Sequence, residues 1–296
     1  MDWLDRMNGA ISHIEENLTG DIDYEIVARI ACCSVYHFQR MFSFITGVTL
    51  SEYVRRRRLT MAAFELQNSD VKVIDLAMKY GYDSPNSFTR AFQALHGVTP
   101  SSARDKGVRL KAFPRMSFFI SIKGDAEMDY KIVEKGAFKV FGVEKVISMT
   151  NGANFKMIPE FWTECRQNGT LERLMGIPVP ENKNGLCKLN SVMCYRDTGK
   201  DTFPYMVGIV DLEGTAVTPE NLAAVNIGPN TWAIFRSEEH GMEDATEKIQ
   251  KLWGRIFPEW FPTSDYEHAD GPELELTYYI AENKCYTEVW IPVVKK

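Results

Sequence analysis

Two stretches of this chain, residues 34–49 and 84–99, carry polar side chains that could read the bases of DNA. In each stretch, three polar residues stand at positions i, i+3 and i+4, a spacing that puts them on one face of a helix. Arg, Asn and Gln side chains hydrogen-bond the base edges exposed in the major groove. The residues predicted to contact double-stranded DNA are Tyr36, Gln39 and Arg40, and Asn86, Thr89 and Arg90. The alternative is an ordinary amphipathic helix with a solvated polar face.

The two stretches are copies of each other, and a repeat at fixed spacing indicates one structural unit used twice. Each copy opens on a serine suited to capping a helix and ends near a glycine suited to terminating it. Phenylalanines at helical spacing predict a buried stripe. A short apolar segment and a tight connection precede each copy, which together predict two helix-turn-helix units. The identical positions are Ser34/Ser84, Phe38/Phe88, Arg40/Arg90, Phe42/Phe92, Gly47/Gly97, Val48/Val98 and Thr49/Thr99.

Residues from about 5 to 106 resemble the DNA-binding domain of the AraC/XylS family of bacterial transcription activators. Two positions depart from the family pattern, Ala103 and Cys33, and both affect packing rather than DNA contact. The resemblance implies an all-α tandem helix-turn-helix domain. It is carried most fully by Ile74, Ala77, Gly81, Tyr82, Ser84, Phe88, Arg90, Phe92, Gly97, Thr99, Pro100 and Arg104.

Charge is unevenly spread along the 296 residues, whose formal net charge is −6. Residues 36–109 hold 11 basic and 6 acidic side chains, while residues 111–296 hold 21 and 27. The basic excess therefore coincides with the helix-turn-helix units, as DNA binding requires. We predict a DNA-binding domain at residues 1–110, a linker at 111–126 and a second domain at 127–296.

Four consecutive arginines, residues 55–58, lie in a predicted helix over residues 50–67. Four consecutive helical residues sweep most of a turn, so they cannot all face one DNA backbone. We expect one or two to contact phosphate and the others to be solvated or paired with acidic side chains.

After residue 127 the pattern changes to strands and helices in a repeating order. Strands are predicted over residues 128–148 and 186–213 with a helix over 155–175 between them. Strands over 222–236 and 273–293 then flank a helix over 245–260. This order predicts an α+β domain of two β-α-β-β repeats.

The second domain resembles the GyrI-like effector-binding domain found in Rob-type AraC regulators. The resemblance covers residues 127–295 and is carried by NTWAIFRSEEHG (230–241), IFPEWFPTSDYE (256–267), DGPELEL (270–276) and TEVWIPV (287–293). It implies a small-molecule effector held near an acidic residue of the last strand.

In that last strand Tyr286, Glu288 and Trp290 alternate onto one face. A carboxylate flanked by aromatic rings suits a lipophilic cation, because the rings add cation–π attraction. The alternative is a strand face half open to water on which Glu288 is only solvated. Tyr278 and Trp253 are further candidates for the walls of this effector site.

These patterns predict a cytoplasmic, ligand-responsive transcription regulator that binds DNA and a small, cationic or aromatic effector, and that contacts RNA polymerase. Neither a membrane segment, a metal site, a cofactor nor a catalytic motif is expected. Six cysteines without C-x-x-C pairs are expected as reduced thiols. Two rival functions remain open, a GyrI-like small-molecule hydrolase fused to a DNA-binding domain, and an activator whose second domain contacts polymerase or another protein.

Overall fold

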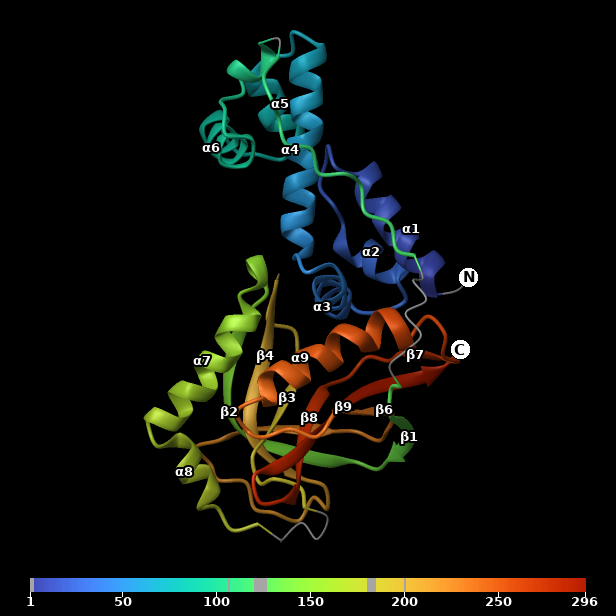
Figure 1. Ribbon diagram of the computed structural model, residues 1–296, viewed down its shortest axis with the longest axis vertical. Coiled ribbons are helices and arrows are strands. Elements are labelled where there is room, and N and C mark those ends of the chain that lie inside the picture. Colours follow the sequence, from blue (N-terminus) through green and yellow to red (C-terminus); the bar gives the residue numbers. More distant parts are fainter. Residues whose placement is uncertain (1–2, 106, 120–126, 180–184, 200) are drawn as a thin grey trace. The chain divides into compact units, whose positions relative to one another are not determined.

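The computed structural model describes residues 3–105, 107–119, 127–179, 185–199 and 201–296 (Figure 1). The chain divides into two compact units. The first unit contains residues 1–35 and 48–119, and the second contains residues 36–47 and 120–296. The domain boundaries that we predict at residues 110 and 127 remain a prediction. Part of the predicted linker, residues 111–126, lies outside the described residues. Among the described residues, no helix is both long and apolar enough to cross a membrane.

The first unit is built of helices, as the sequence predicts. They are α1 (Trp3–Glu16), α2 (Tyr24–Ile30), α4 (Leu50–Asn68), α5 (Val73–Lys79) and α6 (Pro85–His96), followed by the short turn η1 (Ser102–Arg104). Asp23 caps α2 by accepting hydrogen bonds from the backbone N–H groups of Glu25 and Ile26. A cap of this kind satisfies backbone donors that have no partner inside the helix.

Helix α6 begins and ends where the repeat predicts. The Ser84 side chain accepts from the backbone N–H of Ser87, Pro85 stands at the first helical position, and Gly97 adopts a left-handed conformation with φ of 81°. Phe88 and Phe92 are fully buried in a core that also includes residues of α4 and α5. The packing of these rings leaves the opposite side of α6 to solvent.

The four arginines of α4 make contacts within the first unit. Arg55 and Arg56 both pair with Glu52. The Arg57 guanidinium donates to the Glu15 carboxylate at 2.7 Å and to the Phe113 carbonyl at 2.5 Å. Arg58 donates to the Gly20 carbonyl. The expectation that some of these arginines pair with acidic side chains is confirmed by these contacts.

The second unit repeats the order of strands, helix and strands twice. Its first half holds β1 (Tyr130–Lys135), β2 (Phe138–Ser148), α7 (Asn154–Gln167), α8 (Thr170–Met175), β3 (Asn190–Met193) and β4 (Thr202–Asp211). Its second half holds β5 (Ala223–Ile227), β6 (Asn230–Arg236), α9 (Ala245–Arg255), the π-helical turn η3 (Ile256–Trp260), β7 (Tyr266–His268), β8 (Glu273–Ala281) and β9 (Lys284–Lys295). The predicted α+β class is confirmed, with two strands rather than one before each helix.

One predicted helix, residues 155–175, is two helices in the structure. The chain breaks between α7 and α8 at Gly169, whose φ of 74° lies in the left-handed region. Glycine adopts this conformation at little cost because it lacks a Cβ atom.

The strands form a single antiparallel sheet in the order β1-β6-β9-β8-β3-β4-β2-β5, with β7 added beside β9. The first strand of each half pairs with the second strand of the other half, since β1 pairs with β6 and β5 pairs with β2. Strands β8 and β3 form the seam at the centre of the sheet. Both halves are therefore needed to complete the sheet.

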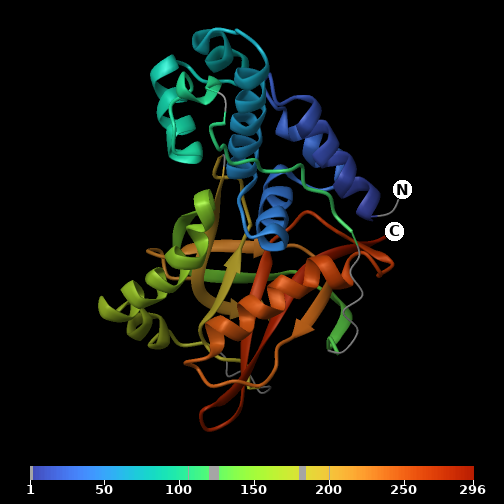
Figure 2. The same ribbon diagram turned by 45° about the horizontal axis from the view of Figure 1, so that its top comes forward.

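The two faces of the sheet carry different side chains. One face is an apolar core that includes Leu274, Leu276, Trp232 and Trp290. The other face packs against helices, since Trp253 of α9 donates to Glu275 of β8 and Trp162 of α7 donates to Tyr205 of β4. Figures 1 and 2 show α7 and α9 lying along the sheet.

Helix α3 (Val35–Thr46) belongs to the second unit for all but its first residue. Its residues from Tyr36 onward lie against the helix-covered face of the sheet, where Arg40 pairs with Glu273 of β8. This helix is the first of the two repeat copies, so one predicted DNA-reading element is placed beside the strands that form the sheet's centre.

Candidate functional site

Two carboxylates of β8 share the helix-covered face of the sheet. Glu273 and Glu275 alternate with Leu274 and Leu276, which belong to the apolar core on the other face. The carboxylates therefore lie side by side near the centre of the sheet. The alternation is visible in the DGPELEL motif, although neither carboxylate is among the predicted effector residues.

Glu275 accepts hydrogen bonds only from neutral donors in the part of the chain that the structure describes. One oxygen accepts from the Trp253 indole N–H at 2.8 Å and the other from the Ser191 hydroxyl at 2.9 Å. Burial raises the pKa of the Glu275 carboxyl, and these two hydrogen bonds offset only part of that effect. A cation brought to this carboxylate would stabilise its charged form.

Glu273, by contrast, has a cation beside it. Burial raises the pKa of the Glu273 carboxyl, but the charge of Arg40 and the hydrogen bond from His268 outweigh burial and bring the pKa to about 2. Glu273 is 1% exposed and Arg40 is 4% exposed, so the ion pair is removed from water. A buried pair of this kind is costly to break, because either partner alone would be left as an uncompensated charge.

Aromatic rings surround the Arg40 guanidinium. Its central carbon lies 4.5 Å from the centre of the Trp253 ring, 5.2 Å from that of Phe44 and 5.4 Å from that of Phe203. Each ring face attracts a cation, and the attraction grows when the cation is desolvated. We call Glu273, Glu275, Trp253 and Phe203 the cation site. In this structure it holds the side chain of Arg40.

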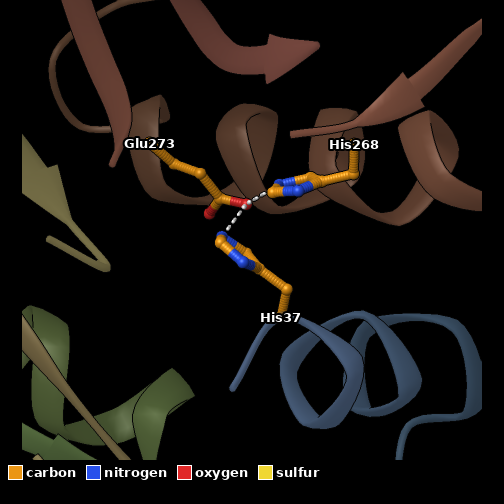
Figure 3. A group of neighbouring side chains, drawn as sticks. All are labelled: His37, His268 and Glu273. Atoms are coloured by element: carbon orange, nitrogen blue, oxygen red, sulfur yellow. Dashed lines mark hydrogen bonds and ion pairs between the residues drawn. The ribbon is translucent and has the colours of Figure 1, made fainter. Parts of the chain in front are cut away.

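Figure 3 shows a second feature beside the cation site, in which His37 and His268 both point toward Glu273. The three side chains offer two nitrogens and one oxygen within 4.8 Å of one another, a donor set that suits zinc. The other oxygen of Glu273 pairs with Arg40, whose positive charge opposes a divalent ion at the same carboxylate. Burial lowers the pKa of His37, and the nearby His268 lowers it further. The geometry is better described as a polar network around Glu273.

The other predicted residues of α3 are also bonded within the second unit or buried. The Tyr36 hydroxyl donates to the sulfur of Cys194, and burial raises the pKa of both groups. Gln39 is 4% exposed. Within this structure, α3 does not present Tyr36, Gln39 and Arg40 on a solvent-facing surface.

The matching residues of α6 lie differently. Asn86 and Arg90 are exposed, and Thr89 is partly exposed. The two copies of the repeat therefore differ in what surrounds their predicted DNA-reading faces. The sequences of the two copies gave no sign of this difference.

The residues predicted around Glu288 lie mostly together, on the apolar-core face of the sheet. Glu288 accepts from the ammonium group of Lys131 at 2.7 Å and from the Trp290 indole N–H at 2.9 Å. Tyr278 and Tyr286 stack with ring centres 5.1 Å apart, and Arg236 covers the Tyr286 ring. Trp253, the remaining predicted effector residue, contacts Glu275 on the opposite face. The predicted set is therefore divided between two faces of the sheet.

A separate open groove, about 830 Å³ in volume, lies by α8. Its lining is mostly apolar and includes Ile177 and Val217, and Arg173 is its only charged lining residue among those the structure describes. Without a carboxylate, this groove suits a neutral ligand better than a cation.

Comparison with protein families agrees with the two-part organisation. Residues 27–106 match the model of a helix-turn-helix domain, and residues 128–294 match that of the GyrI-like small molecule binding domain. The second match covers more than half of the chain. The predicted order, a DNA-binding domain followed by a sensor domain, is confirmed by these matches.

Individual relatives are transcription regulators. The chain is 44% identical over 91 residues to the HTH-type transcriptional activator AarP of Providencia stuartii, a match that covers 31% of this chain and 67% of that protein. It is 36% identical over 96 residues to the regulatory protein SoxS of Escherichia coli K12, covering 32% of this chain and 90% of SoxS. A solved structure of SAV2435 bound to tetraphenylphosphonium aligns with 56% of this chain and 94% of its own, at 15% identity and a TM-score of 0.43. The chain belongs to the AraC-type helix-turn-helix transcription regulators and carries a GyrI-like small molecule binding domain.

Proposed function

We propose that this regulator reads DNA with both repeat helices and responds to an organic cation bound in its second unit. On DNA, the reading side chains would be Tyr36, Gln39 and Arg40 of α3 and Asn86, Thr89 and Arg90 of α6. The residue types and spacing support this assignment, because each set combines an arginine with hydroxyl or amide groups on one helix face. Two such helices would enter successive major grooves, about 34 Å apart.

The observation that best supports a cationic effector is the cation site. A guanidinium group already lies there against a carboxylate and aromatic rings, which are the groups that recognise lipophilic cations. The acidic balance of residues 111–296 would also favour cations over anions at long range.

Two carboxylates compete for the role of charge partner, and they stand on opposite faces of the sheet. Glu288, with Trp290, Tyr286 and Tyr278, is the partner that the sequence predicts. Glu288 already has the Lys131 ammonium beside it, so an incoming cation would gain less there. The hydrogen-bond donors of Glu275 in the described parts of the chain are neutral, and we propose that it faces the effector together with Trp253.

A titration with matched ligands tests this proposal. Tetraphenylphosphonium serves as the cation and triphenylphosphine oxide as the neutral ligand of similar shape, with tryptophan fluorescence as the readout. Replacing Glu275 by Gln keeps the shape and removes the charge. We expect the variant to bind the cation about tenfold more weakly, a loss of about 1.4 kcal/mol, while its affinity for the neutral ligand stays within about twofold.

The same titration on the Glu288→Gln variant decides between the two carboxylates. A selective loss of cation affinity in this variant alone would make Glu288 the charge partner. Equal losses for the charged and neutral ligands in both variants would contradict a cationic effector.

We propose that the chain is not an enzyme, because its relatives are named as transcription regulators. The hydrolase alternative predicts turnover of the bound ligand, which mass spectrometry of the incubated mixture would detect. A DNA-binding regulator works where the chromosome is, so a cytoplasmic location is proposed as well. Contact with RNA polymerase is a further proposal, supported by the activator among the relatives.

A further inference from the structure

Helix α3 contributes a predicted base-reading arginine to a site that also suits the effector. Arg40 is 4% exposed and pairs with Glu273, while its counterpart in the other copy of the repeat, Arg90, is exposed. The same side chain cannot contact DNA bases and lie under Trp253. Arg40 therefore has two mutually exclusive uses.

The surroundings of Arg40 match those that an aromatic cation would need. The guanidinium is a delocalised cation that stacks on aromatic faces, as the Trp253 and Phe203 rings allow. Its charge faces Glu273, and the neighbouring Glu275 adds to its stabilisation. A planar or aryl-substituted cation would take the same carboxylate and the same rings.

Other side chains of α3 besides Arg40 also hold the helix in this position. The Tyr36 hydroxyl bonds Cys194, and the Phe44 ring stacks on Trp253 with ring centres 5.5 Å apart. Phe44 also packs against Phe155 of α7. These contacts hold the helix over the cation site, so a ligand that enters the site must displace the helix.

We propose that Arg40 is an internal substitute for the effector: α3 closes the cation site in the resting protein, and a bound organic cation expels the helix and frees it to read DNA. The inference rests on the proposed cationic effector and adds the means by which that effector is coupled to DNA. In the resting state only α6 would present its reading face.

Removing the internal competitor tests the inference from the ligand side. In the full-length protein, Arg40→Ala is expected to bind tetraphenylphosphonium at least about tenfold more tightly. The reason is that α3 occupies the cation site less of the time when Arg40 is absent, so more of the protein is free to bind the cation. Arg29→Ala, an exposed arginine of α2, is the control that removes the same charge and is expected to leave cation affinity unchanged. Unchanged or weaker cation binding by the folded Arg40→Ala protein would overturn the inference.

The coupling to DNA is tested with a different variant, so that the inference does not depend on one variant protein folding. DNA affinity is measured on a duplex that the wild-type protein selects from a random library in the presence of tetraphenylphosphonium. Wild-type protein is expected to bind it about tenfold more tightly with the cation than without. Glu273→Gln removes the anchor of Arg40 and is expected to bind tightly without the cation and to respond little to it.

Glu282→Gln, at the exposed turn between β8 and β9, is the matched control and is expected to respond to the cation as wild type does. A Glu273→Gln protein that binds the duplex as weakly as cation-free wild type would overturn the inference. If wild type binds the cation but the duplex affinity does not change, the proposed effector stands and the coupling through α3 is wrong. If no variant binds the cation, both are wrong.

Discussion

Glu275 is a carboxylate whose hydrogen-bond donors, Trp253 and Ser191, are both neutral. Its neighbour Glu273 lies on the same face but is neutralised by Arg40. Burial raises the pKa of both carboxyls; at Glu273 the charge of Arg40 and the hydrogen bond from His268 outweigh that effect, whereas at Glu275 the neutral hydrogen bonds do not. Two carboxylates in one strand therefore differ, since Glu273 is paired with an internal cation and Glu275 is bonded to neutral groups.

The state of Glu275 leads to a prediction about stability. A carboxyl whose pKa is raised on folding costs stability while it is ionised, and the cost disappears as pH falls through the folded pKa toward the unfolded value. Glu275→Gln should therefore raise the unfolding temperature by a few degrees at pH 7. Near pH 4 the variant and wild type should unfold at similar temperatures.

Differential scanning calorimetry at several pH values measures this difference directly. Ser237→Ala, which removes a hydroxyl that accepts from the backbone N–H of Thr287 in β9, is not a charge change and should show no pH-dependent difference from wild type. A Glu275→Gln protein that is less stable than wild type at pH 7 would mean that the ionised carboxylate is already compensated.

Site residues were predicted from the sequence only where the residue type itself suggested the chemistry. Glu288 stood out because two aromatic residues flank it, and Glu273 and Glu275 did not, because they alternate with leucines that dominate the pattern. The alternation predicts that both carboxylates share a face. Which face the helices cover depends on the rest of the sheet, so the pattern of one strand does not predict it. Arg40 comes from a segment more than two hundred residues away, so its pairing with Glu273 could not be predicted from the local pattern either.

Among the elements, the helices of the repeat and the strand-helix-strand order followed the predicted pattern closely. Local signals were sufficient there: Ser84, Pro85 and Gly97 mark the ends of α6, and the change from helical to alternating periodicity marks the start of the second unit. The pairing of β1 with β6 and of β5 with β2 was not predicted, because partner choice depends on contacts that periodicity does not encode. The position of α3 in the second unit has the same cause.

Helix α4 provides a prediction about the role of its arginines. Arg57 is 10% exposed and its guanidinium bonds Glu15 and the Phe113 carbonyl, so it holds parts of the first unit together rather than facing solvent. Arg57→Ala should cost about 3 kcal/mol of folding free energy, since Glu15 would lose its paired guanidinium and keep only the Tyr53 hydroxyl as a bonded side chain among the described residues. The salt dependence of DNA binding should keep the wild-type slope.

Arg55, which is 40% exposed, is the comparison within the same helix. Arg55→Ala should change stability little, and it should reduce the salt slope by at most about one unit if it contacts phosphate. Chemical denaturation and DNA titrations at several salt concentrations give both quantities. A lowered slope for Arg57→Ala with unchanged stability would contradict its structural role.

For the whole molecule, the proposed exclusion between effector and α3 implies a reciprocal coupling. If the cation raises DNA affinity by some factor, DNA must raise cation affinity by the same factor, because both ligands favour the state in which α3 has left the cation site. Tetraphenylphosphonium titrated against the protein saturated with its selected duplex should therefore bind about tenfold more tightly than against free protein.

Isothermal titration calorimetry of the free and DNA-bound protein measures the two affinities. The closed state is weakened in the Arg40→Ala protein, so DNA should raise its cation affinity by less than it does in wild type. A cation affinity in wild type that DNA leaves unchanged would show that the two ligands do not share an equilibrium.

The exchange of first strands between the two halves of the sheet has a consequence for synthesis and folding. Strand β2 has β4 on one side, but its other neighbour, β5, follows only after the whole first half has been made. Likewise β1 finds its partner β6 only in the second half. A nascent chain that ends between the halves therefore exposes an unpaired β2 edge and an unpaired β1, and such edges recruit strands from other chains. Slow pairing of distant strands lengthens this interval, so fragments that end between β4 and β5 should aggregate during expression where the complete chain folds.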